Sequence, residues 1–71
     1  MILRHEKIST KYAYLEVILI KAVESYIVIE SYIALDGKSK YADTYTYYDI
    51  DEANQQFDSI INSWLFLQLN I

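Results

Sequence analysis

The chain has 71 residues, of which 54% are hydrophobic and eight are tyrosine, and its formal net charge is −4 at pH 7. This length is sufficient for one domain, residues 1–71, and leaves no room for a second. The absence of cysteine excludes disulfides and thiolate metal sites, and the single histidine, His5, excludes a metal site of several histidines. A domain this small needs dense apolar packing or self-association to be stable.

The charges divide the chain into three parts. Acidic and basic residues cancel over residues 1–35, residues 36–58 carry the whole net charge, and residues 59–71 contain no charged side chain. Glutamates and Lys21 interrupt the most apolar stretch, residues 15–35, so no transmembrane helix is predicted. The first ten residues do not follow the pattern of a secretory signal. We therefore expect a cytoplasmic protein without a cofactor.

The first half of the chain is predicted to form strands. Residues 2–8 are expected to form a short edge strand, and residues 12–21 form a strand whose apolar centre runs from Val17 to Ile20. Residues 15–35 also fit the spacing of a helix, but their polar residues leave no polar face, and their β-branched content favours two strands. The connection at residues 22–25 contains no typical turn residue, so the helical alternative stays open.

A turn at Asp36-Gly37 is predicted to join two further strands, residues 26–35 and 40–48. Asp-Gly between strand-like runs is a strong hairpin signal. Alternation along the first of these strands separates an isoleucine side from a tyrosine side, and we predict that the isoleucine side packs against a helix. The isoleucine side carries Ile27, Ile29 and Ile33. The tyrosine side of the hairpin is expected to stay open, with Tyr26, Tyr32, Tyr41, Tyr45 and Tyr47.

A helix is predicted from Asp49 to about Leu69. Asp49 with Glu52 three residues later forms an acidic capping box, and apolar residues then recur at spacings of three and four. Phe57, Ile60, Ile61 and Trp64 are expected to meet the isoleucine side and the Val17/Leu19 side of the sheet. The fold class is therefore α+β: an antiparallel meander of three or four strands, followed by one amphipathic helix packed on one face.

The last part of this helix is apolar on nearly every side. A helix that is apolar all round must be buried all round. Burial in the core and burial in a homodimer interface are equally good explanations, and the candidate interface residues are Leu65, Phe66 and Leu69.

No catalytic motif is visible. One glycine cannot make a phosphate-binding loop, no nucleophile motif occurs, and His5 beside Glu6 has no partner that would make it an acid-base pair. The acids do not follow the order of a calcium-binding loop. We therefore predict a protein that is not an enzyme and that has no metal site.

The acids and tyrosines after the Asp-Gly turn predict a surface that binds a protein partner. Helix capping and a solvated face are the simpler explanation of the acids, and cross-strand packing explains the tyrosines as well as binding does. As a binding surface, clustered acids would steer the chain to a basic partner, and tyrosine rings would serve as rigid anchors. The candidate residues are Tyr41, Asp43, Tyr45, Tyr47, Asp51, Glu52 and Asp58.

Two other functions remain open. A binder of single-stranded nucleic acid would use Tyr41, Tyr45 and Tyr47 with Lys38 and Lys40, although a net charge of −4 opposes phosphate binding. The third possibility is a purely structural homo-oligomer.

The organisation of residues 12–71 resembles that of small phage and mobile-element proteins, including anti-CRISPR and other host-defence inhibitors. The shared features are a meander, an Asp-Gly turn, a strand rich in Tyr and Thr, and an acid-capped helix. The resemblance implies an inhibitor that binds and blocks a host nucleic-acid enzyme, with carboxylates standing in for phosphates, in the host cytoplasm. The order of strands and helix is also similar to PUR-type and Whirly-type single-strand binders, from which this chain differs in its acidity.

Overall fold

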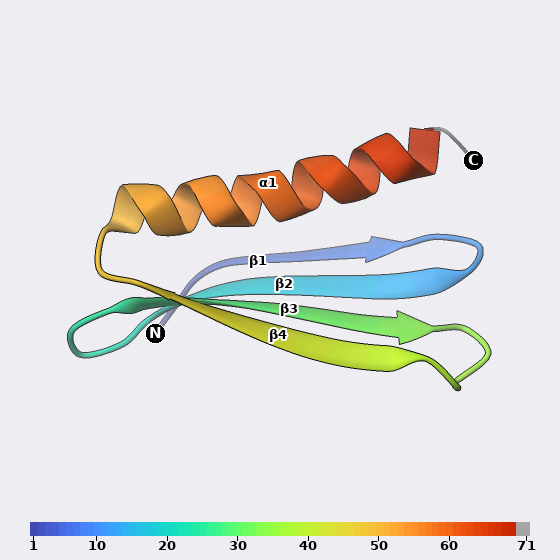
Figure 1. Ribbon diagram of the computed structural model, residues 1–71, viewed down its shortest axis with the longest axis horizontal. Helices are drawn as coiled ribbons and strands as arrows, with labels where there is room; N and C mark the ends of the chain where they lie inside the picture. Colours follow the sequence, from blue (N-terminus) through green and yellow to red (C-terminus); the bar gives the residue numbers. More distant parts are fainter. Residues whose placement is uncertain (70–71) are drawn as a thin grey trace.

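A computed structural model describes the backbone of residues 1–69 and the side chains of residues 1–66. Four strands, β1 (Ile2–Ser9), β2 (Ala13–Lys21), β3 (Tyr26–Ala34) and β4 (Lys40–Tyr47), precede one helix, α1 (Ile50–Leu69). Each strand pairs antiparallel with the next, so β1 and β4 form the two edges of one open sheet (Figure 1). The predicted α+β meander with a C-terminal helix is confirmed.

The region that sequence patterns left open, residues 15–35, forms two strands. The β2–β3 ladder runs in register from Ala13↔Ala34 to Lys21↔Tyr26. A tight connection closes it, in which the Ala22 amide donates to the Ser25 carbonyl at 2.9 Å. No residue of this connection has a positive φ, so it needs no glycine.

The Asp-Gly turn is present as predicted. Asp49 caps α1, but among the described residues no hydrogen bond from the Glu52 side chain completes the predicted capping box. Gly37 has a φ of 73°, which a residue with a Cβ rarely adopts, and its amide donates to the Ala34 carbonyl at 3.0 Å. At the start of α1, the Asp49 carboxylate accepts a hydrogen bond from the Asp51 amide at 3.0 Å. Asp51 and Glu52 lie in the first turn, where the helix dipole favours negative charge.

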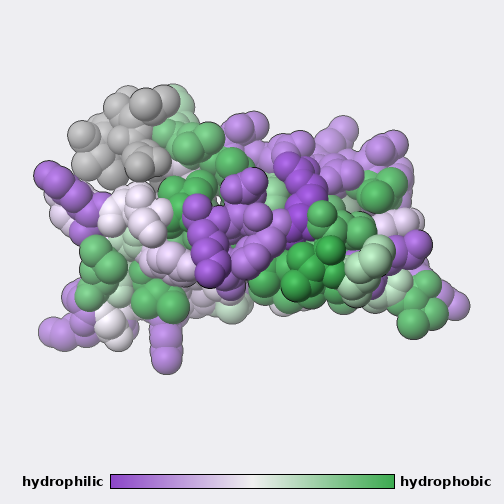
Figure 2. Space-filling view, turned by 180° about the vertical axis from the view of Figure 1, so that it is seen from behind, coloured by the Kyte–Doolittle hydropathy of each residue, from purple (hydrophilic) through white to green (hydrophobic). Residues whose placement is uncertain are grey.

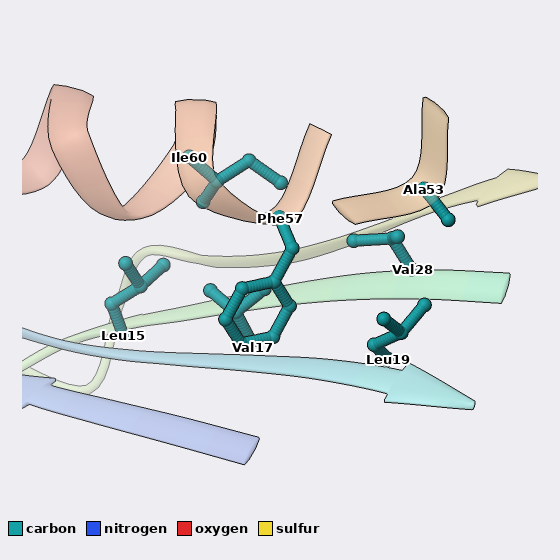
Figure 3. Close-up of a cluster of buried hydrophobic side chains, with 7 residues drawn as sticks. All are labelled: Leu15, Val17, Leu19, Val28, Ala53, Phe57 and Ile60. Atoms are coloured by element: carbon teal, nitrogen blue, oxygen red, sulfur yellow. The ribbon is translucent and has the colours of Figure 1, made fainter. Parts of the chain in front are cut away.

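The core lies between α1 and the middle of the sheet. Phe57 is completely buried, and its ring projects from α1 onto side chains of β2 and β3 (Figure 3). Phe57 is the largest of the fully buried side chains, and burying a side chain of this kind contributes about 1.5–3 kcal/mol to stability. The buried cluster consists of Leu15, Val17, Leu19, Val28, Ala53, Phe57 and Ile60.

The prediction that the isoleucine side of β3 faces the helix is wrong. Val28 pairs with Leu19, and residues directly opposite each other share a face, so Val28 lies under α1. Ile27, Ile29 and Ile33 project from the other face. The alternation along β3 cannot decide the question alone, because both of its sides are largely apolar. The neighbouring strand decides it, since Leu15, Val17 and Leu19 form an unbroken apolar side of β2, whereas Glu16 interrupts the opposite side.

The tyrosines do share one face, but it is the face on which α1 packs. The prediction that this face is open is therefore wrong, although Tyr41 itself stays 46% exposed. Tyr26, Tyr45 and Tyr47 are half-buried and pack against the core cluster. Tyr32 lies beside Trp64 of the helix, with ring centroids 5.5 Å apart. Tyr41 completes the set near the β3–β4 turn. The opposite face, which no element covers, is called the open face below.

Over the part of the chain that the structure describes, no helix is both long enough and apolar enough to cross a membrane.

Candidate protein-binding surface

The edge strand β4 presents four of the seven candidate residues on one side. Tyr41, Asp43, Tyr45 and Tyr47 alternate along it and all project toward the helix side. Tyr41 is 46% exposed, whereas Tyr45 and Tyr47 are half-buried against the core. Tyr41 and Asp43 are therefore the accessible members of this row, and we call them, with Glu30 opposite Asp43, the β4 edge site.

Stacked rings hold Tyr41 in place. Its ring lies 5.1 Å from that of Tyr32 with an interplanar angle of 16°, and Tyr32 in turn contacts Trp64. Aromatic pairs in offset-stacked or tilted arrangements contribute about 0.5–1.5 kcal/mol beyond their buried area. The result is a ladder of three rings from the helix to the sheet edge, which makes Tyr41 a rigid, half-exposed anchor.

Two carboxylates face each other in the same site. Glu30 of β3 pairs directly with Asp43 of β4. Partial burial raises the pKa of Glu30, and the charge of Asp43 raises it further. The pKa values of Tyr41 and Tyr45 are also raised, first by removal from water and then by the charges of Glu30 and Asp43. All three pKa shifts have the same direction and the same order of causes, removal from water first and the negative charge of neighbouring groups second.

The helix contributes Glu52 to the same side of the molecule. Glu52 lines a shallow depression with Tyr47, Gln55, Gln56 and Ser59, next to the C-terminal end of β4. Asp51 is also exposed in this first turn. Acids of the helix start thus extend the negative surface from the end of β4.

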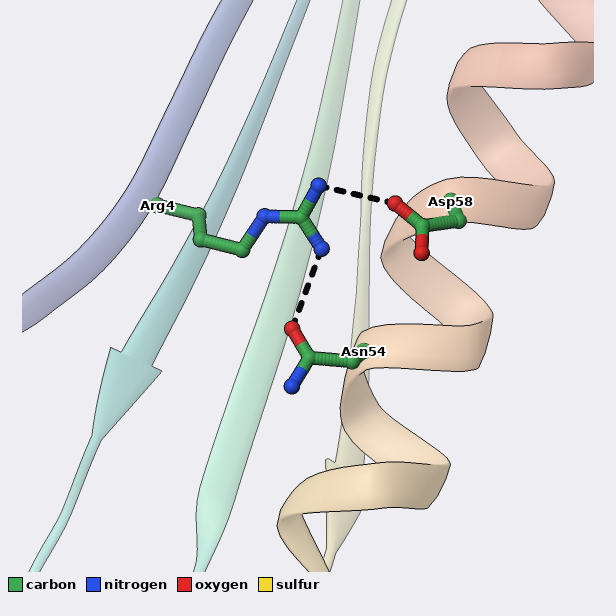
Figure 4. Close-up of polar contacts among 3 residues, drawn as sticks. All are labelled: Arg4, Asn54 and Asp58. Carbon is green, nitrogen blue, oxygen red and sulfur yellow. Dashed lines mark hydrogen bonds and ion pairs between the residues drawn. The ribbon is translucent and has the colours of Figure 1, made fainter.

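Asp58 lies elsewhere, because Arg4 of β1 binds it. The Arg4 Nη2 donates to Asp58 Oδ1 at 2.8 Å, and Nη1 donates to Asn54 Oδ1 at 3.0 Å (Figure 4). The guanidinium also lies over the Phe57 ring, 4.1 Å from its centroid. Asp58 is therefore on the β1 flank of the helix, and the structure does not bring it together with the β4 edge site. No sequence spacing indicated this contact.

The geometry does not assemble the tyrosines and lysines that a nucleic-acid binder would need. Lys40 pairs with Ile33, whereas the adjacent Tyr41 pairs with Tyr32, so the two side chains project from opposite faces of β4. Lys38 lies in the turn, where its amide donates to Asp36 Oδ1 at 2.8 Å. Asp43 and Glu30 therefore lie beside Tyr41 and Tyr45. Among the described side chains, the one ammonium group near the tyrosine row is that of Lys21, 6.0 Å from the Tyr26 ring centroid at the far end of the row.

The candidate oligomer interface is only partly described. Leu65 is 44% exposed and Phe66 is 66% exposed on α1, while the side chain of Leu69 lies outside the described residues. A second apolar surface, which the sequence analysis missed, lies on the open face. The sequence indicates this surface, because both sides of β2 and β3 are rich in apolar residues.

His5 and Lys7 both contact Glu16 on the open face. Its Nε2 lies 2.9 Å from Glu16 Oε2, and the Lys7 ammonium lies 3.8 Å from the same oxygen. Among the described side chains, no group of three or more acidic or histidine residues is placed to hold a metal ion.

Comparison with known proteins adds no assignment to this small α+β domain with its acidic, tyrosine-bearing edge. No family model matches the chain, no curated protein is similar to it, and no solved structure is similar to it. The functional conclusion is therefore drawn from the chain's own residues.

Proposed function

We propose that this protein is a non-enzymatic binding module that docks a basic protein surface through the β4 edge site. The observation that carries the proposal is the direct pairing of Glu30 with Asp43 beside the exposed ring of Tyr41. Like charges directly opposite each other on adjacent strands destabilise a sheet. A basic partner would convert this repulsion into attraction, so the arrangement is suited to a bound state.

The three parts of the site have complementary roles in such a complex. Asp43 and Glu30 would accept hydrogen bonds from arginine or lysine side chains of the partner. Tyr41 would supply apolar contact area, and little entropy would be lost on binding because Tyr32 already holds its ring. As an edge strand, β4 also offers unpaired backbone groups to the partner.

The kind of partner follows from this chemistry. A surface built to bind phosphates presents arginine and lysine side chains, which carboxylates at an edge can occupy in place of the phosphates. The proposed activity is thus inhibition of a host nucleic-acid enzyme, such as a CRISPR effector, by covering its nucleic-acid-binding surface.

Affinity capture tests this proposal. The tagged chain is incubated with host lysate, with and without nuclease treatment, and the bound proteins are identified by mass spectrometry. We expect one nearly stoichiometric protein that survives nuclease treatment and that dissociates at high salt. Recovery of nucleic acid, or of proteins that disappear after nuclease treatment, would instead support a nucleic-acid binder.

A further inference from the structure

The open face carries a block of four isoleucines at its centre. The pairs Ile18↔Ile29 and Ile20↔Ile27 join β2 and β3 on this face, and we call the four residues the isoleucine quartet. All four are only half-buried, although isoleucine is among the residue types most often found inside proteins. In the view from behind, green apolar surface gathers near the middle of the molecule beside purple polar surface (Figure 2).

Ile2 extends the quartet to one edge of the sheet, whereas polar residues flank the quartet at the other three positions. Ile2 and Thr46 flank the pair Ile20/Ile27, and His5 and Thr44 flank the pair Ile18/Ile29. None of the four central positions carries a charge or an unpaired polar group. Monomeric proteins rarely leave such a continuous apolar surface exposed, so we infer that something covers it.

We propose that a second copy of this chain covers the open face, with the two isoleucine quartets packed against each other in a symmetric, two-sheet dimer. The shape of the face favours this occupant. Four strands of this length, at the usual spacing of neighbouring strands, span an area of about 500 Å². A helix is about 10 Å wide and would cover only about half of that width.

The area of the open face is also sufficient for a specific interface. Two copies packed face to face would bury about 1,000 Å² in total, which is close to the lower bound of about 1,000 Å² for a specific interface. Sheets that pack in this way lie about 10 Å apart, with apolar side chains of both inner faces between them. A second copy supplies such a face by symmetry.

The distribution of charge permits a dimer through the open face, although each chain has a net charge of −4. Of the acidic residues, only Glu16 projects from the open face, where His5 and Lys7 already contact its carboxylate. Lys40 is the remaining charged residue on that face. Two copies that meet through the open face therefore keep the β4 edge site and the acids of α1 on their outer sides. The dimer uses a different surface from the proposed partner site and stands independently of it.

Light scattering on the full chain tests the dimer. We expect a mass of twice 8.4 kDa that falls to one chain on dilution. The double substitution Ile27→Thr/Ile29→Thr keeps β-branched residues in β3 but makes the centre of the face polar, and should yield folded monomer. Val23→Thr, at a position 98% exposed in the β2–β3 connection, is the matched control and should remain dimeric.

A second measurement is independent of whether the double variant folds. The chain contains no cysteine, so Ile29→Cys introduces a single thiol at the centre of the proposed interface. Its alkylation by iodoacetamide should slow as the protein concentration rises, whereas the rate for Val23→Cys should not change. A monomeric chain, a concentration-independent rate at position 29, or a dimer that Leu65→Gln disrupts and Ile27→Thr/Ile29→Thr does not, would overturn the proposal.

Discussion

Glu30 and Asp43 are directly opposite each other on β3 and β4, so two carboxylates share one cross-strand position at the edge of the sheet. Across the same row, Glu30 pairs on its other side with Val17, whose side chain is completely buried. Glu30 thus lies between the core and a second negative charge. This position accounts for the raised pKa of Glu30. It also means that the carboxylate pair, which would favour binding of a basic partner, destabilises the free chain.

Replacing Glu30 by glutamine should stabilise the isolated chain at neutral pH. The substitution removes repulsion between opposed carboxylates, and cross-strand pairs contribute about 0.2–1 kcal/mol. Because folding raises the pKa of Glu30 above 4.5, the folded state binds the proton more tightly, and stability gains from Glu30 as the pH falls through the folded pKa. The advantage of Glu30→Gln should therefore shrink at acidic pH, where Glu30 is neutral in both states.

Urea denaturation at several pH values measures this effect. Glu6→Gln on the opposite edge strand makes the same chemical change away from Asp43 and serves as control. A Glu30→Gln protein less stable than the parent at pH 7 would show that the pair is favourable in the free chain.

Arg4 should matter more to stability than other exposed basic residues. It binds Asp58 and Asn54 and lies over Phe57, so one side chain ties β1 to α1. Arg4→Met keeps the apolar stem but removes these contacts, and should cost about 1 kcal/mol. Arg4→Lys should recover only part of this loss, because a lysine lacks the planar fork that reaches both partners.

Chemical denaturation of Arg4→Met, Asp58→Asn and the double variant separates the ion pair from the other contacts. Lys11→Met, in the exposed β1–β2 connection, is the control and should have little effect. Additive effects of Arg4→Met and Asp58→Asn would contradict a direct interaction between the two side chains.

Phe57→Ala should remove a large fraction of the protein's stability. Truncating a buried phenylalanine costs about 3–5 kcal/mol, and a chain of this length has a total stability of only about 4–10 kcal/mol. Tyr48→Ala removes a ring that is 82% exposed and should change stability little. Thermal unfolding followed by circular dichroism distinguishes the two. Equal effects at both positions would contradict the placement of the core between α1 and β2.

The sequence predicted element types well because its local signals agree. The Asp49 cap, the glycine turn at Gly37 and the β-branched residues of β2 and β3 each act over a few residues, and each is found where it was expected. Local patterns could also show that the five tyrosines share a face. They could not show which face the helix covers, because that depends on register between strands and on packing across the sheet.

The candidate site was predictable only in part for the same reason. Tyr41 and Asp43 share one side of β4 by simple alternation. The ion pair of Asp58 joins residues separated by 54 positions in the chain, which no spacing rule anticipates. The pairing of Glu30 with Asp43 follows once the register of the Asp36-Gly37 hairpin is known. The hairpin turn is therefore a better guide to this site than the number of acidic residues.

The most direct test of partner binding at the β4 edge site is a comparison of two charge reversals. Affinity for the captured partner is measured by calorimetry at low and high salt for Asp43→Lys and Glu6→Lys, which change the net charge equally at opposite edges of the sheet. If the β4 edge docks a basic surface, Asp43→Lys should weaken binding by tenfold or more and flatten its salt dependence, since a desolvated charge pair contributes about 2 kcal/mol or more. Glu6→Lys should leave affinity nearly unchanged. Equal losses from both variants would show that overall charge steers the association, and undiminished binding by Asp43→Lys would contradict the β4 edge as the docking site.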